Sequence, residues 1–283
     1  MRKRLKRTFA EANPARDCTG VYSAFDIIGD LAIIKTPKNS LFGASEVAKA
    51  VMDRHKNIKS VFVQASEVRG DFRLRGLAHV AGENRTCTVH RESGCSFKVD
   101  LAKCYFSPRL SGERMRIANL VKNGETIINM FAGVGCFSII IAKQAKNVTV
   151  YSIDINPVAV EFMADNARLN GVYANVVPIL GDSKNVISDR LQRCADRVLM
   201  PLPEKAFEYL PVAVSALKPR GGWIHVHAFE HATKKERIPE GFKHYLSEAL
   251  GPLNVDFEVR GIRVIRSTGP NWWQSVADVY VSV

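Results

Sequence analysis

The stretch TIINMFAGVGCFSIIIAK, residues 126–143, decides how this chain folds. An apolar run leads into a short turn that contains Gly133 and Gly135, and apolar residues resume directly after it. This pattern predicts a buried strand, a tight loop and a buried helix, in which the glycines let the backbone approach a nucleotide-like ligand. A glycine turn alone is weak evidence, so a ligand-free strand–helix turn is the alternative at this point.

Strands and helices alternate regularly around this stretch. We expect strands near 125–131, 148–154, 174–180, 196–201 and 221–228, and helices near 135–145, 157–169, 183–193 and 204–217. Such alternation implies parallel strand pairing and a doubly wound α/β sheet. The end of the chain differs, because a helix near 233–250 precedes two consecutive strand candidates, 253–266 and 273–283. These two strands predict an antiparallel hairpin at the sheet edge.

The residues before Pro108 are organised in another way. Turn signals and alternating apolar residues predict two β-hairpins, a helix and a further strand, in the order 22–37, 45–56 with Ser45 as N-cap, 59–65 and 85–106. We therefore expect a basic lead-in at 1–19, a small α+β domain at 20–110 and a Rossmann-like domain at 111–283.

Charge indicates the class of partner. The 283 residues include 40 Lys and Arg against 28 Asp and Glu, which gives a net charge of +12 and a pI near 9.5. A polyanion such as nucleic acid is the leading physical explanation, and a generally basic proteome or a basic tail is the alternative. No apolar run is long enough to span a membrane, and the basic start lacks a signal-peptide core, so we expect a cytoplasmic protein.

Acidic residues at two further strand ends indicate the ligand. Asp154 closes the second predicted strand, at the distance from the glycine loop where a carboxylate would accept hydrogen bonds from ribose hydroxyls. Asp182 follows the third strand, where it would meet the adenine. These features suit either NAD or S-adenosylmethionine, but FAGVG lacks the third glycine of a pyrophosphate-binding loop. Together with the terminal hairpin, this favours S-adenosylmethionine and a methyltransferase.

A metal site is not expected. His225, His227 and His231 lie close together in HVHAFEH, but no third ligand follows at a suitable spacing. The six cysteines include no CxxC pair, so we interpret them as core or surface thiols, with a disulfide within 87–104 left open.

Four segments carry a family resemblance: AGENRTCTVHRESGCSFKVDLAKCYFSPRLSGERMRI (81–117), NMFAGVGCFSI (129–139), DINPVAVEFMADNARLNGV (154–172) and DRVLMPLPEKAFEYL (196–210). Together they resemble the archaeal and eukaryotic tRNA guanine-37 N1-methyltransferases, from about residue 25 to the C-terminus. The resemblance implies methyl transfer from S-adenosylmethionine to N1 of guanosine 37 in tRNA. The expected partner is therefore tRNA, bound through its anticodon stem-loop, and the domain at 20–110 is expected to engage this RNA. The enzyme is expected to be a monomer.

The resemblance also assigns catalytic residues. It makes Glu125 the general base, because N1 of neutral guanine carries a proton that must leave before N1 can attack. It makes Arg85 a donor to O6, where negative charge develops. Without the resemblance, Glu125 reads as an exposed carboxylate at a strand start and Arg85 as a solvated loop arginine.

Further residues are assigned to the cofactor pocket or to the tRNA on the same basis. The expected cofactor residues are Phe106, Arg114, Asn129, Phe131, Gly133, Gly135, Asp154, Ile155, Asp182, Ser183 and Pro201. Arg109 and Pro203 are expected on the tRNA side.

Two departures from the family pattern concern specificity. Asn129 stands where Asp is usual, which weakens a charge interaction with the methionine ammonium while leaving a hydrogen bond. Pro201 stands where Asn is usual, in Pro-Leu-Pro instead of Asn-Leu-Pro, and this resembles an archaeal subgroup that also methylates a tricyclic wyosine precursor. The N-terminal domain with which many relatives touch the tRNA elbow is expected to be absent.

Three alternatives to guanine N1 methylation follow. The enzyme could methylate C7 of the tricyclic precursor, or transfer the aminocarboxypropyl arm of the cofactor to it. SPRL and the Leu-Pro motif favour methyl transfer over the latter. A catalytically silent tRNA-binding protein is the non-enzyme alternative, which the retained Glu125 and Arg85 argue against.

Overall fold

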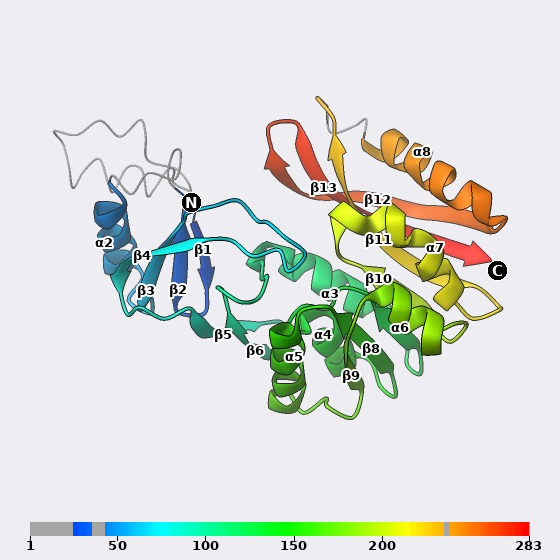
Figure 1. Cartoon of the computed structure of the whole chain (residues 1–283), viewed down its shortest axis with the longest axis horizontal. Helices are drawn as coiled ribbons and strands as arrows, with labels where there is room; N and C mark the ends of the chain where they lie inside the picture. Colours follow the sequence, from blue (N-terminus) through cyan, green and yellow to red (C-terminus); the bar gives the residue numbers. More distant parts are fainter. Residues whose placement is uncertain (1–24, 36–42, 235–237, 283) are drawn as a thin grey trace. The chain divides into compact units, whose positions relative to one another are not determined.

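The computed structural model describes residues 25–35, 43–234 and 238–282, coloured along the chain in Figure 1. The chain divides into two compact units, Met1–Arg109 and Leu110–Val283. The basic lead-in expected at 1–19 lies outside the described residues.

A four-stranded mixed sheet with the order β1-β2-β3-β4 forms the N-terminal unit; the strands are β1 (Phe25–Ile28), β2 (Leu31–Ile34), β3 (Ser60–Gln64) and β4 (Leu77–Gly82). Helix α2 (Ala44–Arg54) connects β2 to β3 and buries Val47 and Val51 against the sheet. The N-cap of α2 is Gly43, so the prediction of Ser45 is wrong; Ser45 lies inside the first turn. Strand β4 was not predicted, because LAHVAG is half-buried without a clear alternation.

The second predicted hairpin of this unit is confirmed. Strands β5 (Cys87–Glu92) and β6 (Cys95–Asp100) pair antiparallel. Ser93 and Gly94 connect them with φ values of 51° and 73°, and two consecutive left-handed residues make the tight turn whose twist matches that of the flanking strands.

The C-terminal unit contains the predicted doubly wound sheet, with the strand order β12-β13-β11-β10-β7-β8-β9. Its strands are β7 (Thr126–Asn129), β8 (Thr149–Asp154), β9 (Val176–Leu180), β10 (Arg197–Met200), β11 (Gly222–His231), β12 (Asp256–Gly269) and β13 (Trp272–Ser282). Strands β7 to β11 pair in parallel, whereas β13 lies antiparallel between β11 and β12. The terminal hairpin at the sheet edge is therefore confirmed.

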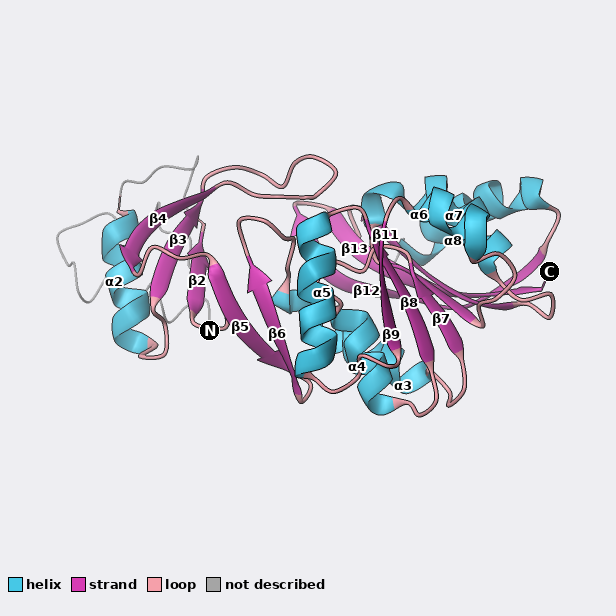
Figure 2. Ribbon diagram, turned by 60° about the horizontal axis from the view of Figure 1, so that its bottom comes forward, coloured by secondary structure: helices cyan, strands magenta, loops and turns pink. Residues whose placement is uncertain are grey.

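Helices cover both faces of this sheet, as Figure 2 shows: α3, α4 and α5 lie on one side and α6, α7 and α8 on the other. Their bounds are α3 (Ser111–Leu120), α4 (Cys136–Gln144), α5 (Pro157–Leu169), α6 (Ser183–Arg190), α7 (Ala206–Ala216) and α8 (Ile238–Leu250), with short 3₁₀ turns at η2 (Pro108–Leu110), η3 (Pro203–Lys205) and η5 (Gly251–Leu253). Within the described ranges, no helix is long and apolar enough to cross a membrane.

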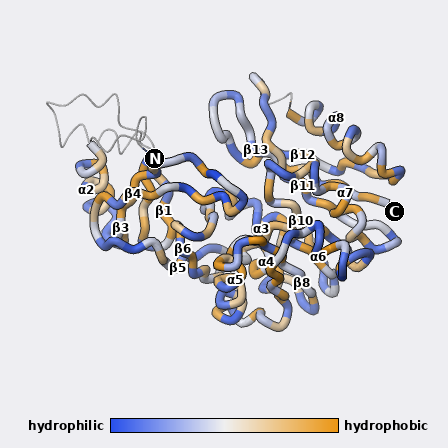
Figure 3. Tube along the Cα trace, viewed as in Figure 1, coloured by the Kyte–Doolittle hydropathy of each residue, from blue (hydrophilic) through white to orange (hydrophobic). Residues whose placement is uncertain are grey.

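Helix α4 anchors the loop that precedes it. Its residues are mostly apolar, as the colouring of Figure 3 shows, and Ile139, Ile140 and Ile141 are completely buried. Burial of such a side chain stabilises the fold by about 1.5–3 kcal/mol. The glycine loop is thus held between a buried strand and a buried helix.

Candidate functional site

The glycine loop and Asp154 are joined directly at the carboxyl ends of β7 and β8. The backbone N–H of Gly133 donates to Oδ2 of Asp154 over 2.7 Å, and Asn156 N donates to Oδ1 over 2.9 Å. Burial raises the pKa of Asp154, and these two hydrogen bonds oppose that effect. The carboxylate is therefore fixed in the place where open α/β sheets bind ligands.

Gly135 is required by conformation and by space. Its φ is +89°, and it is the N-cap of α4. A Cβ atom here would lie 2.9 Å from Cγ of Met163 on α5 and 3.1 Å from Cδ1 of Ile139. The close packing of α5 on the loop thus depends on the missing side chain.

Asp182 lies at the corresponding end of β9. It caps α6 by accepting from Lys184 N over 2.7 Å, and it accepts from the Tyr209 hydroxyl over 2.8 Å. The Tyr209 ring contacts Phe131 of the glycine loop edge-on, with ring centroids 5.1 Å apart. The carboxyl ends of β7, β8 and β9 are thereby linked into one rim, and Ile155 is half-buried in it.

Two predicted cofactor residues lie beneath this rim. The Ser183 hydroxyl is buried and donates to the carbonyl of Met130, so it supports the loop. Asn129 is completely buried, and its Nδ2 donates to Ser138 of α4 over 3.1 Å. Among the described residues, its Oδ1 atom has no hydrogen-bond partner.

The end of β10 reaches the same edge of the sheet. Pro201 and Leu202 follow β10 directly and are half-buried, and Pro203 is buried where η3 begins. Both prolines therefore lie at the carboxyl end of a strand, where they were expected.

Phe106 and Arg109 have contacts within the N-terminal unit. Phe106 is 2% exposed and packs edge-on against His90, with ring centroids 5.0 Å apart. The Arg109 guanidinium pairs with Asp26 over 2.8 Å. These contacts make Phe106 a core aromatic residue and Arg109 a partly exposed, paired cation.

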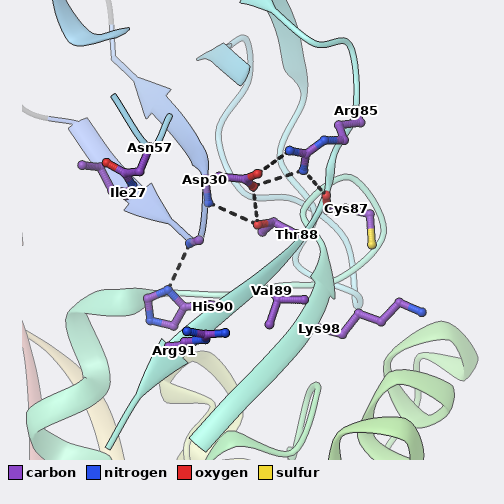
Figure 4. A pocket seen from close by; sticks show the side chains of 11 residues that line it. Ile27, Asp30, Asn57, Arg85, Cys87, Thr88, Val89, His90, Arg91 and Lys98 are labelled. Atoms are coloured by element: carbon purple, nitrogen blue, oxygen red, sulfur yellow. Dashed lines mark hydrogen bonds and ion pairs between the residues drawn. The ribbon is translucent and has the colours of Figure 1, made fainter. Parts of the chain in front are cut away.

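Arg85 lines a pocket of about 680 Å³ in the N-terminal unit, shown in Figure 4. Its guanidinium pairs with both carboxylate oxygens of Asp30, with Glu83 over 2.6 Å and with the Cys87 carbonyl over 2.8 Å. The hydrogen bond to Asp30 is the main reason why the pKa of Arg85 is raised, and the same bond lowers the pKa of Asp30. Arg85 is thus a well-anchored cation, and Arg91 and Lys98 line the same pocket.

Glu125 lies at the opposite end of the sheet from the glycine loop. Glu125 precedes β7 at the amino end of the sheet, whereas the glycine loop follows β7 at the carboxyl end. At about 3.3 Å per residue, the strand separates the two by roughly 16 Å. The Glu125 carboxylate instead forms a double ion pair with Arg197, with Nε–Oε2 at 2.8 Å and Nη2–Oε1 at 3.1 Å. Glu125 is therefore separated from the glycine loop and is held by Arg197.

Another buried carboxylate, Glu113 of α3, is a candidate for the general base, and the sequence-based predictions did not include it. Glu113 is 7% exposed, and burial is the main reason why its pKa is raised. The neighbouring residue, Arg114, is buried and places its guanidinium 5.9 Å from the ring centroid of Phe137, in the first turn after the glycine loop. The only signal in the sequence is an acidic residue in a short Arg-rich helix, which is common on protein surfaces.

The histidines have structural partners. His225 is buried between Asp278 and Arg197, and His227 is buried against the ring of Phe137. Within the described residues there is no group of three or more His, Cys, Asp or Glu that could hold a metal ion. Among the described residues, Cys87, Cys95, Cys104, Cys136 and Cys194 form no disulfide.

Comparison with known proteins identifies the family. The TRM5/TYW2 methyltransferase domain matches residues 88–252, and the TYW2 N-terminal domain matches residues 5–86. The chain is 43% identical to the tRNA (guanine(37)-N(1))-methyltransferase Trm5b of Pyrococcus abyssi, over 92% of this chain and 75% of that protein. It is 35% identical to the tRNA 4-demethylwyosine(37)-methyltransferase Taw21 of Saccharolobus solfataricus, over 93% and 96%.

Solved structures agree with this assignment. The complex of aTrm5 with tRNALeu has a TM-score of 0.82 at 32% identity and covers 98% of this chain and 77% of that one. Other solved relatives are bound to adenosine or AdoMet. The predicted fold class and the prediction of S-adenosylmethionine as cofactor are confirmed. The chain belongs to the TRM5/TYW2 methyltransferase family.

Proposed function

We propose that this protein transfers a methyl group from S-adenosylmethionine to N1 of guanosine 37 in tRNA. The observation that carries the proposal is the rim of Gly133, Asp154 and Asp182 at the carboxyl ends of β7, β8 and β9. The relative with 43% identity bears the name of this activity.

The rim suits the proposed cofactor. Asp154 retains lone pairs for ribose hydroxyls beside the two hydrogen bonds that it accepts from backbone N–H groups. Ile155 follows Asp154 at the end of β8 and Asp182 lies at the end of β9, where both can contact the adenine. The buried Oδ1 of Asn129, which lacks a partner among the described residues, supplies an acceptor for the methionine ammonium. When bound, the cofactor supplies an electrophilic methyl group on a sulfonium.

Other cofactor residues have supporting roles. Gly133 and Gly135 shape the loop, Phe131 packs on Tyr209, and Ser183 holds the loop from below through Met130. Arg114 lies beside Phe137 at the start of α4, and Pro201 closes the end of β10. The assignment of Phe106 to the cofactor pocket rests on the family resemblance, and its packing against His90 does not support it.

We assign the general base to Glu113 in place of Glu125. N1 of guanine carries a proton, and a carboxylate must take it before the nitrogen lone pair can attack the methyl group. A buried carboxylate with a raised pKa is a stronger proton acceptor than an exposed one. Arg85 remains the proposed donor to O6, with Asp30 holding its guanidinium in position.

The proposed partner is tRNA, bound through its anticodon stem-loop by a monomeric enzyme. The net charge of +12 supports binding to phosphates. Arg109 and Pro203 are further candidates on the tRNA side. An isolated anticodon stem-loop is expected to be a usable substrate.

A second candidate substrate is the tricyclic wyosine precursor, methylated at C7. Pro201 supplies no side-chain hydrogen bond and no backbone donor, so it makes the pocket less polar than Asn would. A site with fewer polar contacts rejects a different base less strongly. The similarity to Taw21 over 96% of that protein favours this candidate, whereas aminocarboxypropyl transfer has no comparable support from the site.

One experiment separates these activities. The protein is incubated with methyl-labelled S-adenosylmethionine and tRNA transcripts that carry G37 or A37, and with tRNA that carries the tricyclic precursor, and the labelled nucleoside is identified. Label in 1-methylguanosine from the G37 transcript alone supports the first proposal. Label in the tricyclic base, reduced in Pro201→Asn, supports the second. Absence of label from every tRNA contradicts both and favours a silent binding protein.

A further inference from the structure

A continuous chain of buried hydrogen bonds and ion pairs crosses the C-terminal sheet. Arg116 of α3 binds Glu113 through Nε and Nη2 over 2.8 and 2.7 Å, and binds both carboxylate oxygens of Asp278 on β13 over 2.6 and 2.9 Å. Asp278 in turn lies 2.6 Å from Nδ1 of His225 on β11.

The chain continues to the other end of the sheet. Nε2 of His225 lies 2.7 Å from Nη1 of Arg197, and Arg197 forms the double ion pair with Glu125. Six side chains thus connect the amino end of β7 with Glu113, and each of the six is at most 16% exposed.

We propose that Asp278 and His225 are positioning residues, which hold Arg116 against Glu113 and thereby set the orientation and the proton affinity of that carboxylate. This inference rests on the proposed function, because it treats Glu113 as the base. In this arrangement, Glu125 holds Arg197 in position at the amino end of the sheet.

The geometry defines the protonation state of His225. Arg197 can only donate, so Nε2 of His225 must accept, and the ring proton must sit on Nδ1, where it is donated to Asp278. Burial is the main reason why the pKa of His225 is lowered. A neutral histidine therefore fixes one oxygen of Asp278, while Arg116 fixes both.

The charges of the six connected side chains do not cancel. Glu113, Asp278 and Glu125 are acidic, Arg116 and Arg197 are basic, and His225 is neutral, which leaves one negative charge in excess. Three neighbours act on Glu113: Arg116 favours its ionised form, Asp278 opposes it, and Arg263 of β12 favours it. Asp278 therefore raises the proton affinity of Glu113 in two ways, by repulsion and by sharing Arg116.

The test is the pH dependence of single-turnover methyl transfer at saturating cofactor and tRNA. Asp278→Asn removes the repulsion, and the charge of Arg116 is then shared with no carboxylate other than Glu113. The pKa of Glu113 should fall, so the acid limb of the pH–rate profile should move to lower pH by about one unit. Arg116→Lys should move it in the opposite direction, because a lysine cannot bind both carboxylates with paired donors. In the matched control, Glu258→Gln, an exposed ion pair with Arg260 on β12 is lost and the profile should not move.

His225 is tested with two substitutions. His225→Asn keeps a donor for Asp278 and should retain a profile close to that of the wild type. His225→Leu removes the donor and should shift the acid limb. An equal shift in both variants would overturn the role of His225.

A second readout does not depend on activity. The carboxyl ¹³C signal of Glu113, assigned by its loss in Glu113→Gln, is titrated in wild type, Asp278→Asn and Arg116→Lys. Opposite shifts of the Glu113 pKa in the two variants support the inference. If the signal shifts but the acid limb does not, the coupling stands and Glu113 is not the base, which contradicts the proposed function alone. If the signal titrates identically in all three proteins, the inference is overturned, whatever the activity.

Discussion

Replacement of Glu125 by Gln tests the reassignment of the base. The Arg197 side chain is only 3% exposed, and the Glu125 carboxylate is its charged partner. Loss of one partner from a buried ion pair costs about 3–5 kcal/mol, because the remaining charge is left uncompensated. The substituted glutamine would keep one acceptor oxygen, and Arg197 also donates to the Leu120 carbonyl over 3.0 Å, so we expect a loss of about 2–4 kcal/mol in the free energy of unfolding.

The assay combines stability with chemistry. Urea unfolding of wild type and Glu125→Gln gives the change in free energy, and single-turnover methyl transfer by the folded enzyme gives the rate. We expect the rate to fall less than about tenfold, far below the 10²-fold or greater loss for removal of a general base. Glu208→Gln is the matched control, because the Lys184–Glu208 pair is exposed and should contribute less than about 1 kcal/mol.

The opposite result would refute this reasoning. If Glu125→Gln unfolded like the wild type and lost roughly 10²-fold or more in rate, Glu125 would be the base, as the resemblance implied. The distance along β7 and the pairing with Arg197 would then describe a state that changes when substrate binds.

Substitutions at three other residues and a change of salt concentration test the remaining assignments. Glu113→Gln should lower kcat by roughly 10²-fold or more with little change in cofactor affinity, measured by single turnover and calorimetry; unchanged turnover would exclude Glu113 as the base. Gly135→Ala should destabilise the fold by about 1–3 kcal/mol and weaken cofactor binding, because its Cβ would lie 2.9 Å from Met163 in a left-handed backbone conformation; an unchanged Tm and an unchanged Kd would show that the loop adapts. Burial raises the pKa of Glu230 from 4.5 to about 7, so the unfolded state ionises first and stability falls as pH rises through this window; Glu230→Gln should therefore gain up to about 3 kcal/mol at about pH 8 and nothing at about pH 4 in urea unfolding, and an equal effect at both pH values would contradict this origin. Affinity for tRNA should fall steeply from about 50 to 200 mM salt in a filter-binding assay, and a flat response would argue against phosphate contacts.

Local sequence was sufficient for most of the elements, β4 excepted, and for the rim of Gly133, Asp154 and Asp182. Strand–loop–helix order, the glycines at 133 and 135 and the acidic residues at two strand ends are set within short windows, because periodicity and backbone conformation are local properties. Since parallel strands end at the same edge of the sheet, the positions of Asp154 and Asp182 followed from their places at strand ends. Sequence resemblance identified the family for the same reason, as its motifs are short and contiguous.

Only the tertiary structure decided which side chains face one another. Glu125 and Glu113 are both acidic residues near the start of the second unit, and one lies at the amino end of a strand with Arg197 while the other lies on α3 beside Arg116. Asp278, which also binds Arg116, and His225, which also binds Arg197, come from β13 and β11, far along the chain from α3, and strand pairing sets their register. Electrostatic environment depends on burial and on such distant partners, so the choice between two carboxylates could not be made before the fold brought them into place.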